Sequence, residues 1–153
     1  MKGKIKITAK MLKKYALITI LVVKIDSCGP AIFKQPRIGE DGRTFTIYKF
    51  RSMTSDNDVY DFSKKDKVTK IGKFLRKSGI DELPQLINVI KGDMSLIGPR
   101  PYLLREKDDM GEWYDTVVKC KPGITGYWQV NGRNDTDFDY RLELDHYYLS
   151  YCL

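Results

Sequence analysis

The sequence has little of what metal centres, disulfide frameworks and histidine-based catalysis require. Of its 153 residues, three are cysteine and one is histidine. The cysteines Cys28, Cys120 and Cys152 are odd in number and far apart, so they predict neither a disulfide framework nor a zinc site. His146 has no second histidine for a metal site or a catalytic triad, and its tyrosine-rich surroundings favour a packing or surface role. A reducing, cytoplasm-facing location fits this composition.

Long apolar runs and nucleotide-binding glycine motifs are also missing. The N-terminal apolar run, Tyr15–Val23, is too short to cross a membrane, since a helix of that length covers only about 14 Å, roughly half of the hydrocarbon core of a bilayer. Neither GxGxxG nor GxxxxGK[ST] occurs, so the usual dinucleotide-binding and P-loop modes are unsupported.

The N-terminal segment is strongly basic. Lysines at positions 2, 4, 6, 10, 13 and 14 precede the apolar run, with no acidic residue among them. Three interpretations are open: a secretory signal peptide, a basic amphipathic or dipping anchor at the membrane surface, and an ordinary buried helix or strand behind a solvated tail. Lys24 and Asp26 are unusual beside a cleavage site, which disfavours the first. We expect residues 1–29 to form a membrane-associated segment.

The overall composition indicates one globular domain with basic character. Hydrophobic residues make up 42% and charged residues 31% of the chain, which is long enough for a modest core. The 27 basic and 20 acidic residues give a net charge of +7. This excess favours polyanionic partners, either nucleic acid or an anionic membrane surface with phosphorylated ligands.

Residues 30–153 are expected to form a mostly helical α+β domain with one β-hairpin. Two runs rich in β-branched and aromatic residues, Ala31–Arg37 and Arg43–Arg51, flank Gly39-Glu40-Asp41-Gly42, and Asp-Gly between such runs predicts a hairpin. Apolar spacing and glycine breaks then predict helices. The expected helices are 68–77, one from Asp81 to the C-cap Gly92, 102–119, and one that begins at Asp135 or Thr136, after the glycine-rich loop 121–134.

Two adjacent carboxylates, Asp81 and Glu82, open the second of these helices. As an N-cap and a residue near the positive end of the helix dipole, each would contribute about 0.5–1 kcal/mol. Alternatively, Asp81 is a nucleophile or general base. Beside Arg76 and Lys77 at a helix start, its pKa should be lowered, which would keep it ionised, and the exposed N–H groups would also hold a phosphate.

Several cations have the same two interpretations. Arg76 and Lys77 form either a solvated helix face or a phosphate site. In Gly98-Pro99-Arg100-Pro101 the backbone is fixed on both sides of Arg100, which suits a bidentate grip on phosphate or a structural bridge to a carboxylate. Arg133 is either another phosphate contact or a loop cap.

Lys49 and Arg51 add two cations at the end of the hairpin.

Aromatic and basic residues interleave near Tyr127 and Trp128, which leaves stacking on single-stranded nucleic acid open. The acidic pair and the rigid arginine turn disfavour nucleic acid as a partner. We therefore expect no nucleic-acid partner.

Eight sequence blocks resemble the bacterial sugar transferases, the monotopic polyprenyl-phosphate phosphoglycosyl transferases that begin capsule, exopolysaccharide, O-antigen and glycoprotein glycan assembly. The blocks occur in family order over about residues 25–150. They are Asp26-Ser27-x-Gly29-Pro30, Tyr48-Lys49-Phe50-Arg51-Ser52-Met53, Thr69-Lys70-Ile71-Gly72, Asp81-Glu82-Leu83-Pro84-Gln85-Leu86, Lys91-Gly92-Asp93-Met94-Ser95, Gly98-Pro99-Arg100-Pro101, Pro122-Gly123-Ile124-Thr125-Gly126 and Val130-Asn131-Gly132-Arg133-Asn134.

The resemblance implies a two-step reaction at the cytoplasmic face of the bacterial inner membrane. The family's catalytic aspartate matches Asp81, which would attack the β-phosphate of a UDP-sugar and release UMP. A polyprenyl phosphate, typically undecaprenyl phosphate, would then take the phosphosugar from the aspartate. The resemblance also implies Mg²⁺, with Asp81 and Glu82 as its ligands. The implied phosphate and substrate contacts are Arg76, Arg100 and Arg133, with Lys49 and Arg51 as further candidates.

Two departures from the family pattern concern the ends of the chain. The expected membrane helix is longer in the family and contains a Ser-Pro break, and the family continues beyond the position of Leu153 into another amphipathic helix. An alternative function is therefore a non-catalytic membrane-surface or regulatory remnant. The sequence contains no pattern that identifies the sugar or the oligomeric state.

Overall fold

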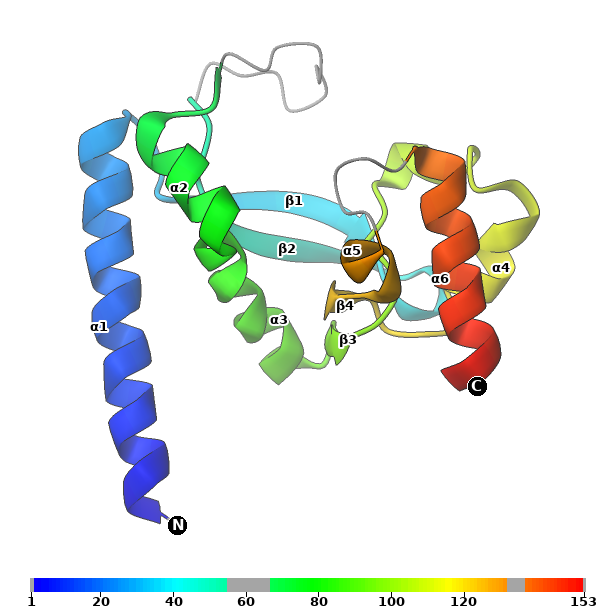
Figure 1. Cartoon of the computed structure of the whole chain (residues 1–153), viewed down its shortest axis with the longest axis horizontal. Helices are drawn as coiled ribbons and strands as arrows, with labels where there is room; N and C mark the ends of the chain where they lie inside the picture. Colours follow the sequence, from blue (N-terminus) through cyan, green and yellow to red (C-terminus); the bar gives the residue numbers. More distant parts are fainter. Residues whose placement is uncertain (1, 55–66, 132–136, 153) are drawn as a thin grey trace. The chain divides into compact units, whose positions relative to one another are not determined.

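A computed structural model describes residues 2–54, 67–131 and 137–152 (Figure 1). Helices dominate and the sheets are small, which confirms the expected α+β class. The elements in chain order are α1 (Lys2–Asp26), β1 (Ile32–Ile38), η1 (Glu40–Gly42), β2 (Thr44–Phe50), α2 (Lys70–Ser78), η3 (Ile80–Gln85), α3 (Leu86–Lys91), β3 (Ser95–Ile97), η4 (Leu104–Glu106), η5 (Gly111–Trp113), α4 (Tyr114–Val117), β4 (Gly123–Thr125), α5 (Tyr127–Val130) and α6 (Phe138–Cys152).

The described residues gather into two compact units. The first unit combines Met1–Phe33 with Lys49–Leu83, and the second combines Lys34–Tyr48 with Pro84–Leu153. β1 and β2 pair as the predicted hairpin, joined by a turn in which Gly39 N–H donates to Arg43 O at 2.8 Å.

In the first unit, α1 and α2 lie side by side (Figure 1). The stripe Ala16, Ile20 and Val23 on α1 joins a core with Phe50 and Leu75. This i, i+4, i+7 spacing buries one face of the helix only. Seven apolar side chains of α1 are exposed: Met11, Leu12, Tyr15, Leu17, Ile18, Leu21 and Ile25.

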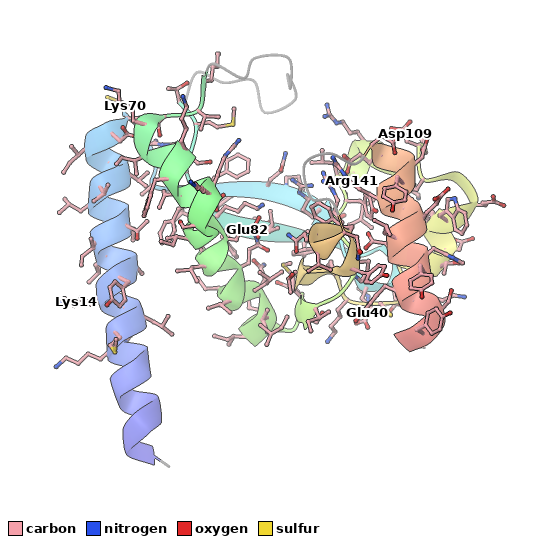
Figure 2. All side chains as sticks on the ribbon, in the orientation of Figure 1. Lys14, Glu40, Lys70, Glu82, Asp109 and Arg141 are labelled. Atoms are coloured by element: carbon pink, nitrogen blue, oxygen red, sulfur yellow. The ribbon has the colours of Figure 1, made fainter. Side chains whose placement is uncertain are left out.

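The exposed apolar side chains of α1 disfavour the interpretation of this segment as an ordinary buried helix. Lys14 also projects from α1 into solvent (Figure 2). Among the helices that the structure describes, none is both long and apolar enough to cross a membrane. Association with a membrane surface stays a prediction.

The start and end of α2 follow from local sequence. The Thr69 side chain accepts a hydrogen bond from Gly72 N–H at 2.9 Å, and the Asp26 carboxylate accepts one from Ile71 N–H at 3.2 Å. Both oxygens satisfy donors that the first turn of a helix leaves without partners. At the other end Gly79 adopts a φ of 71°, the left-handed conformation that a C-cap requires. The predicted break at Ser78-Gly79 is thereby confirmed.

Two helix predictions were wrong in detail. The chain around Asp81 forms a 3₁₀ segment from Ile80, followed by α3, so Asp81 lies inside η3 and is not an N-cap. The helix expected over 102–119 is replaced by η4, η5 and α4, with a break at Gly111, whose φ is 52°. Hydrogen bonds between residues three apart, such as Glu106 N–H to Leu103 O at 3.0 Å, take the place of a continuous helix there.

The second unit contains a parallel sheet that the sequence did not indicate. β3 pairs with β4 in the register Ser95↔Gly123 and Ile97↔Thr125. A Cβ atom on Gly123 would lie 2.2 Å from the backbone nitrogen of Gly98, so only glycine permits this approach. The main core of this unit gathers Ile38, Tyr102, Met110, Val117, Leu142 and Leu149.

Candidate active site

Three charged side chains of the first unit surround Asp81. Lys49, at the end of β2, donates from Nζ to Glu82 Oε1 at 3.0 Å. Glu82 projects from η3, the segment between α2 and α3 in the chain (Figure 2). Arg76, in the last turn of α2, acts electrostatically on the Asp81 carboxylate, as Lys49 does. The structure therefore brings together four of the predicted site residues.

Asp81 is buried, with only 7% of its surface exposed. Its Oδ1 atom has no hydrogen-bond partner among the described residues. Burial raises the pKa of Asp81 above its usual value and the neighbouring Glu82 raises it further, while Lys49 and Arg76 act in the opposite direction.

The predicted lowering of the Asp81 pKa was therefore wrong. The neighbouring cations are evident in the sequence, whereas desolvation, which is the larger effect on this pKa, depends on the packing of the folded chain. A carboxylate that is costly to ionise and lies among charged groups is typical of functional sites.

Ser52 is a member of this group that the sequence analysis did not single out. Its Oγ accepts a hydrogen bond from Arg76 Nε at 2.8 Å, and only 8% of the residue is exposed. The sequence feature that could have identified Ser52 is its place in the block Tyr48–Met53, which also contains the candidate cations Lys49 and Arg51.

The Arg51 side chain contacts the C-terminal end of α1. Its Nη2 donates to the carbonyl oxygens of Ser27 at 2.5 Å and Val23 at 3.4 Å. Its Nε and Nη1 are buried without a partner among the residues described. The guanidinium thus holds the end of α1, and its predicted contact with phosphate stays a prediction.

Arg100 belongs to the second unit, where hydrogen bonds fix its turn. Its backbone N–H donates to Asp145 Oδ2 at 2.9 Å, and Tyr102 OH donates to the same oxygen at 2.8 Å. The Arg100 guanidinium lies 3.7 Å from Glu106 Oε1 and 5.5 Å from the Trp128 ring centroid. This is the structural bridge that the sequence left open; a role in phosphate binding stays a prediction.

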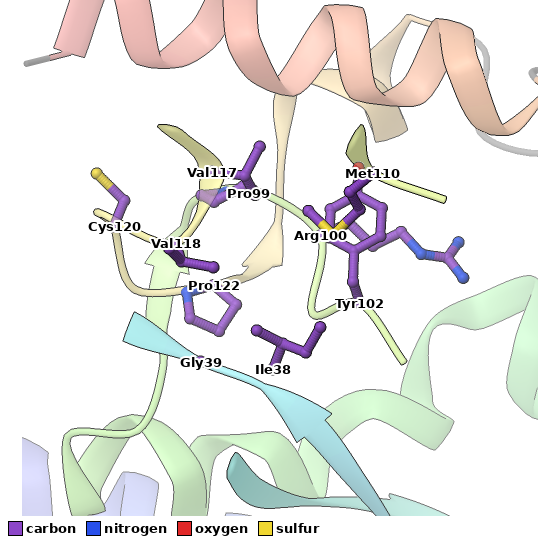
Figure 3. Close-up of a pocket in the computed structure, with 10 residues that line it drawn as sticks. All are labelled: Ile38, Gly39, Pro99, Arg100, Tyr102, Met110, Val117, Val118, Cys120 and Pro122. Carbon is purple, nitrogen blue, oxygen red and sulfur yellow. The ribbon is translucent and has the colours of Figure 1, made fainter. Parts of the chain in front are cut away.

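Asp145 is the buried anchor of that turn, and the sequence did not reveal it. It is fully buried, and burial raises its pKa from 3.8 to about 6. The turn borders a small cavity in the core of the unit, lined by apolar side chains such as Ile38 and Met110 (Figure 3). Arg133, the remaining predicted contact, lies outside the described residues.

Asp81 and Glu82 also form the candidate metal site. The described part of the chain contains no cluster of three or more side chains suited to metal binding. Mg²⁺ is usually held by one or two carboxylates together with substrate phosphates and water. The buried Oδ1 of Asp81, which has no hydrogen-bond partner in the part of the chain that the structure describes, is an oxygen of the kind this ion prefers. The pair therefore fits a site that the substrate completes.

An acidic pair set among cations on an α+β frame is suited to phosphoryl chemistry. The family model for bacterial sugar transferases matches residues 6–152, so the chain belongs to that family and the resemblance seen in the sequence is confirmed.

Curated relatives agree with this assignment. The chain is 47% identical to an uncharacterized sugar transferase, EpsL, of Bacillus subtilis, over 87% of this chain and 67% of that protein. It is 44% identical to an undecaprenyl-phosphate galactose phosphotransferase of Salmonella typhimurium, over 79% of this chain and 29% of the relative. It is also 44% identical to a UDP-glucose:undecaprenyl-phosphate glucose-1-phosphate transferase of Escherichia coli, over 84% of this chain and 30% of that enzyme. The chain thus spans less than a third of the length of the last two relatives.

Proposed function

We propose that the chain transfers a sugar 1-phosphate from a UDP-sugar to undecaprenyl phosphate, with Asp81 as the nucleophile. The activities for which the Salmonella and Escherichia relatives are named support the reaction class. The observation that carries the assignment to Asp81 is its buried carboxylate oxygen without a partner in the described residues, beside the Lys49–Glu82 pair and Arg76.

In the first step, an Asp81 oxygen bonds to the β-phosphorus of the UDP-sugar. The bond from that phosphorus to the oxygen bridging the two phosphates breaks, and UMP leaves with this oxygen. In the second step, a phosphate oxygen of the lipid attacks the same phosphorus, and Asp81 leaves as a carboxylate. Each step is a substitution at phosphorus, for which positioning and charge stabilisation supply most of the catalysis.

The charged neighbours of Asp81 have different roles in this reaction. Arg76 and Lys49 favour the ionised carboxylate that attack requires, and the exposed end of Arg76 is available to a substrate phosphate. Glu82 holds Lys49 in place. Mg²⁺, held by Asp81 and Glu82 together with substrate phosphates, would neutralise charge on those phosphates.

We place the reaction at the cytoplasmic face of the bacterial inner membrane. The exposed apolar side chains of α1, interleaved with exposed lysines such as Lys13 and Lys14, support attachment to an anionic surface. The acceptor lipid would be reached from that surface.

Incubation with UDP-glucose or UDP-galactose and Mg²⁺ tests the proposal. We expect release of UMP and, without acceptor lipid, a phosphosugar adduct on Asp81 detected by mass spectrometry. Asp81→Asn should abolish both, whereas Asp109→Asn, which changes an exposed aspartate of the second unit, should not. Turnover or an adduct that survives Asp81→Asn would refute this mechanism. UDP-sugar binding without any UMP release would favour the non-catalytic alternative.

A further inference from the structure

Ser52 occupies a position that its surroundings hold fixed. Its carbonyl oxygen accepts a hydrogen bond from Thr69 N–H at 3.1 Å, at the start of α2. A Cβ atom on Gly72 would lie 2.0 Å from that oxygen, so α2 packs directly on the Ser52 backbone. On the other side, Arg51 N–H donates to Ala31 O at 2.8 Å. The Ser52 hydroxyl is therefore presented from a rigid support.

Arg76 is held by this hydroxyl at one atom only. Its Nε donates to Ser52 Oγ at 2.8 Å, although the residue as a whole is exposed. A flexible arginine side chain loses rotamer entropy when it is fixed. A bond at Nε supplies part of that ordering in advance and leaves the two terminal nitrogens for a bidentate contact with phosphate.

The packing explains a small residue at position 52, but it does not explain a hydroxyl. The atoms nearest to a Cβ on Gly72 belong to the backbone of Ser52, and alanine has the same backbone. Among the described residues, the Ser52 hydroxyl oxygen accepts its hydrogen bond from Arg76. A role through Arg76 is what distinguishes serine from alanine at this place.

We propose that Ser52 is a positioning residue that orients the Arg76 guanidinium toward the phosphate-bearing substrate beside Asp81. The inference rests on the proposed function, because it names the residue that prepares one of the substrate contacts of that site. It predicts that removal of the hydroxyl acts only through Arg76.

The first test does not depend on turnover. In ¹H–¹⁵N spectra of the whole chain, the Nε–H signal of Arg76 is assigned by its loss in Arg76→Lys, and its exchange with solvent is measured. We expect at least tenfold faster exchange in Ser52→Ala. Ser78→Ala is the matched control, because Ser78 Oγ bonds to the Phe74 and Leu75 carbonyls of the same helix. Unchanged exchange in Ser52→Ala would overturn the proposal, whether or not the chain is an enzyme.

The second test is a double-mutant cycle on kcat/KM for the UDP-sugar. Loss of a hydrogen bond to a charged group predicts a decrease of about tenfold in Ser52→Ala. No further decrease is expected when Ser52→Ala is added to Arg76→Gln. An equal decrease in both backgrounds would indicate a merely structural role and refute the inference.

If no UDP-sugar is turned over, the proposed function fails, and the same cycle is run on the Kd for UDP. In that case Ser52→Ala must weaken UDP binding when Arg76 is present and must have no effect in the Arg76→Gln protein. Ser52→Thr, which keeps the hydroxyl, should retain most of the affinity. An equal loss in Ser52→Ala and Ser52→Thr would contradict a role for the oxygen.

Discussion

Gly72→Ala tests the contact that joins α2 to the segment carrying Ser52. The new Cβ would lie 2.0 Å from the carbonyl oxygen of Ser52, 2.7 Å from its carbonyl carbon and 2.8 Å from its Cα. All three are backbone atoms, so no side-chain rotation relieves the overlap. Either α2 or the Ser52 segment must move.

Two effects of this substitution oppose each other. Alanine in place of glycine within a helix stabilises by about 0.5–1 kcal/mol. Forcing extra volume into packed structure costs about 1–3 kcal/mol, and contact with backbone on this scale puts Gly72 at the upper end. We therefore expect a net loss of about 2 kcal/mol in the free energy of unfolding, which is a decrease of roughly 4–8 °C in Tm for a chain of this size.

Urea unfolding followed by circular dichroism measures this change. Lys73→Ala, the next residue of the same helix, exposed to solvent, is the control and should change stability by less than about 0.5 kcal/mol. A Gly72→Ala protein as stable as the unmodified chain would refute the packing argument. In that case the claim that α2 holds the Ser52 backbone in a fixed position would also be refuted.

Three other predictions concern charge and the surface of α1. Because burial raises the pKa of Asp145 from 3.8 to about 6, the folded state keeps a proton that the unfolded state releases between these values. The contribution of this group to stability is thus greatest below pH 3.8 and is lost as the pH rises to about 6. Asp145→Asn should remove that decline, and the difference in unfolding free energy between the two proteins at pH 4 and pH 7 checks it. Glu82→Gln should lower the pKa of Asp81 and Lys49→Met should raise it, because Glu82 disfavours and Lys49 favours the ionised carboxylate. Carbon-13 titration of the Asp81 carboxyl measures both, and shifts of the same sign would contradict the arrangement. Leu21→Glu changes a residue that is 62% exposed, so it should leave the fold intact. It should lower the affinity for anionic vesicles, measured by co-sedimentation, at least tenfold. Unchanged sedimentation would refute attachment through α1.

Elements with strong local signals were predictable from the sequence. The hairpin follows from β-branched runs around Asp41-Gly42, and α2 follows from apolar spacing that ends at Gly79. Each depends on residues that are close together in the chain. The parallel pairing of β3 with β4 depends instead on the approach of Gly98 to Gly123, residues far apart in the sequence. No local pattern carries that information.

The same distinction explains the candidate site. Asp81, Glu82 and the nearby Arg76 are close in sequence, so their common location was predictable. The raised pKa of Asp81 was not, because burial is a property of the packed unit. Ser52 and Arg76 are separated by 24 positions and meet only because α2 packs on the Ser52 backbone.

A raised pKa does not by itself identify the reactive carboxylate, because Asp81 and Asp145 share this property. Asp145 has no exposed surface, and the oxygen that accepts hydrogen bonds does so from the Arg100 backbone and the Tyr102 hydroxyl. These neutral donors fix a turn, and a substrate has no access to them. Asp81 instead retains some exposed surface, and its neighbours Lys49 and Arg76 are cations. Arg100 also acts electrostatically on Asp145, so the distinguishing feature is access: accessible cations beside Asp81 can attract a phosphate, whereas Asp145 is sealed within the fold. The surroundings of the two carboxylates therefore support our proposal of Asp81, and not Asp145, as the nucleophile.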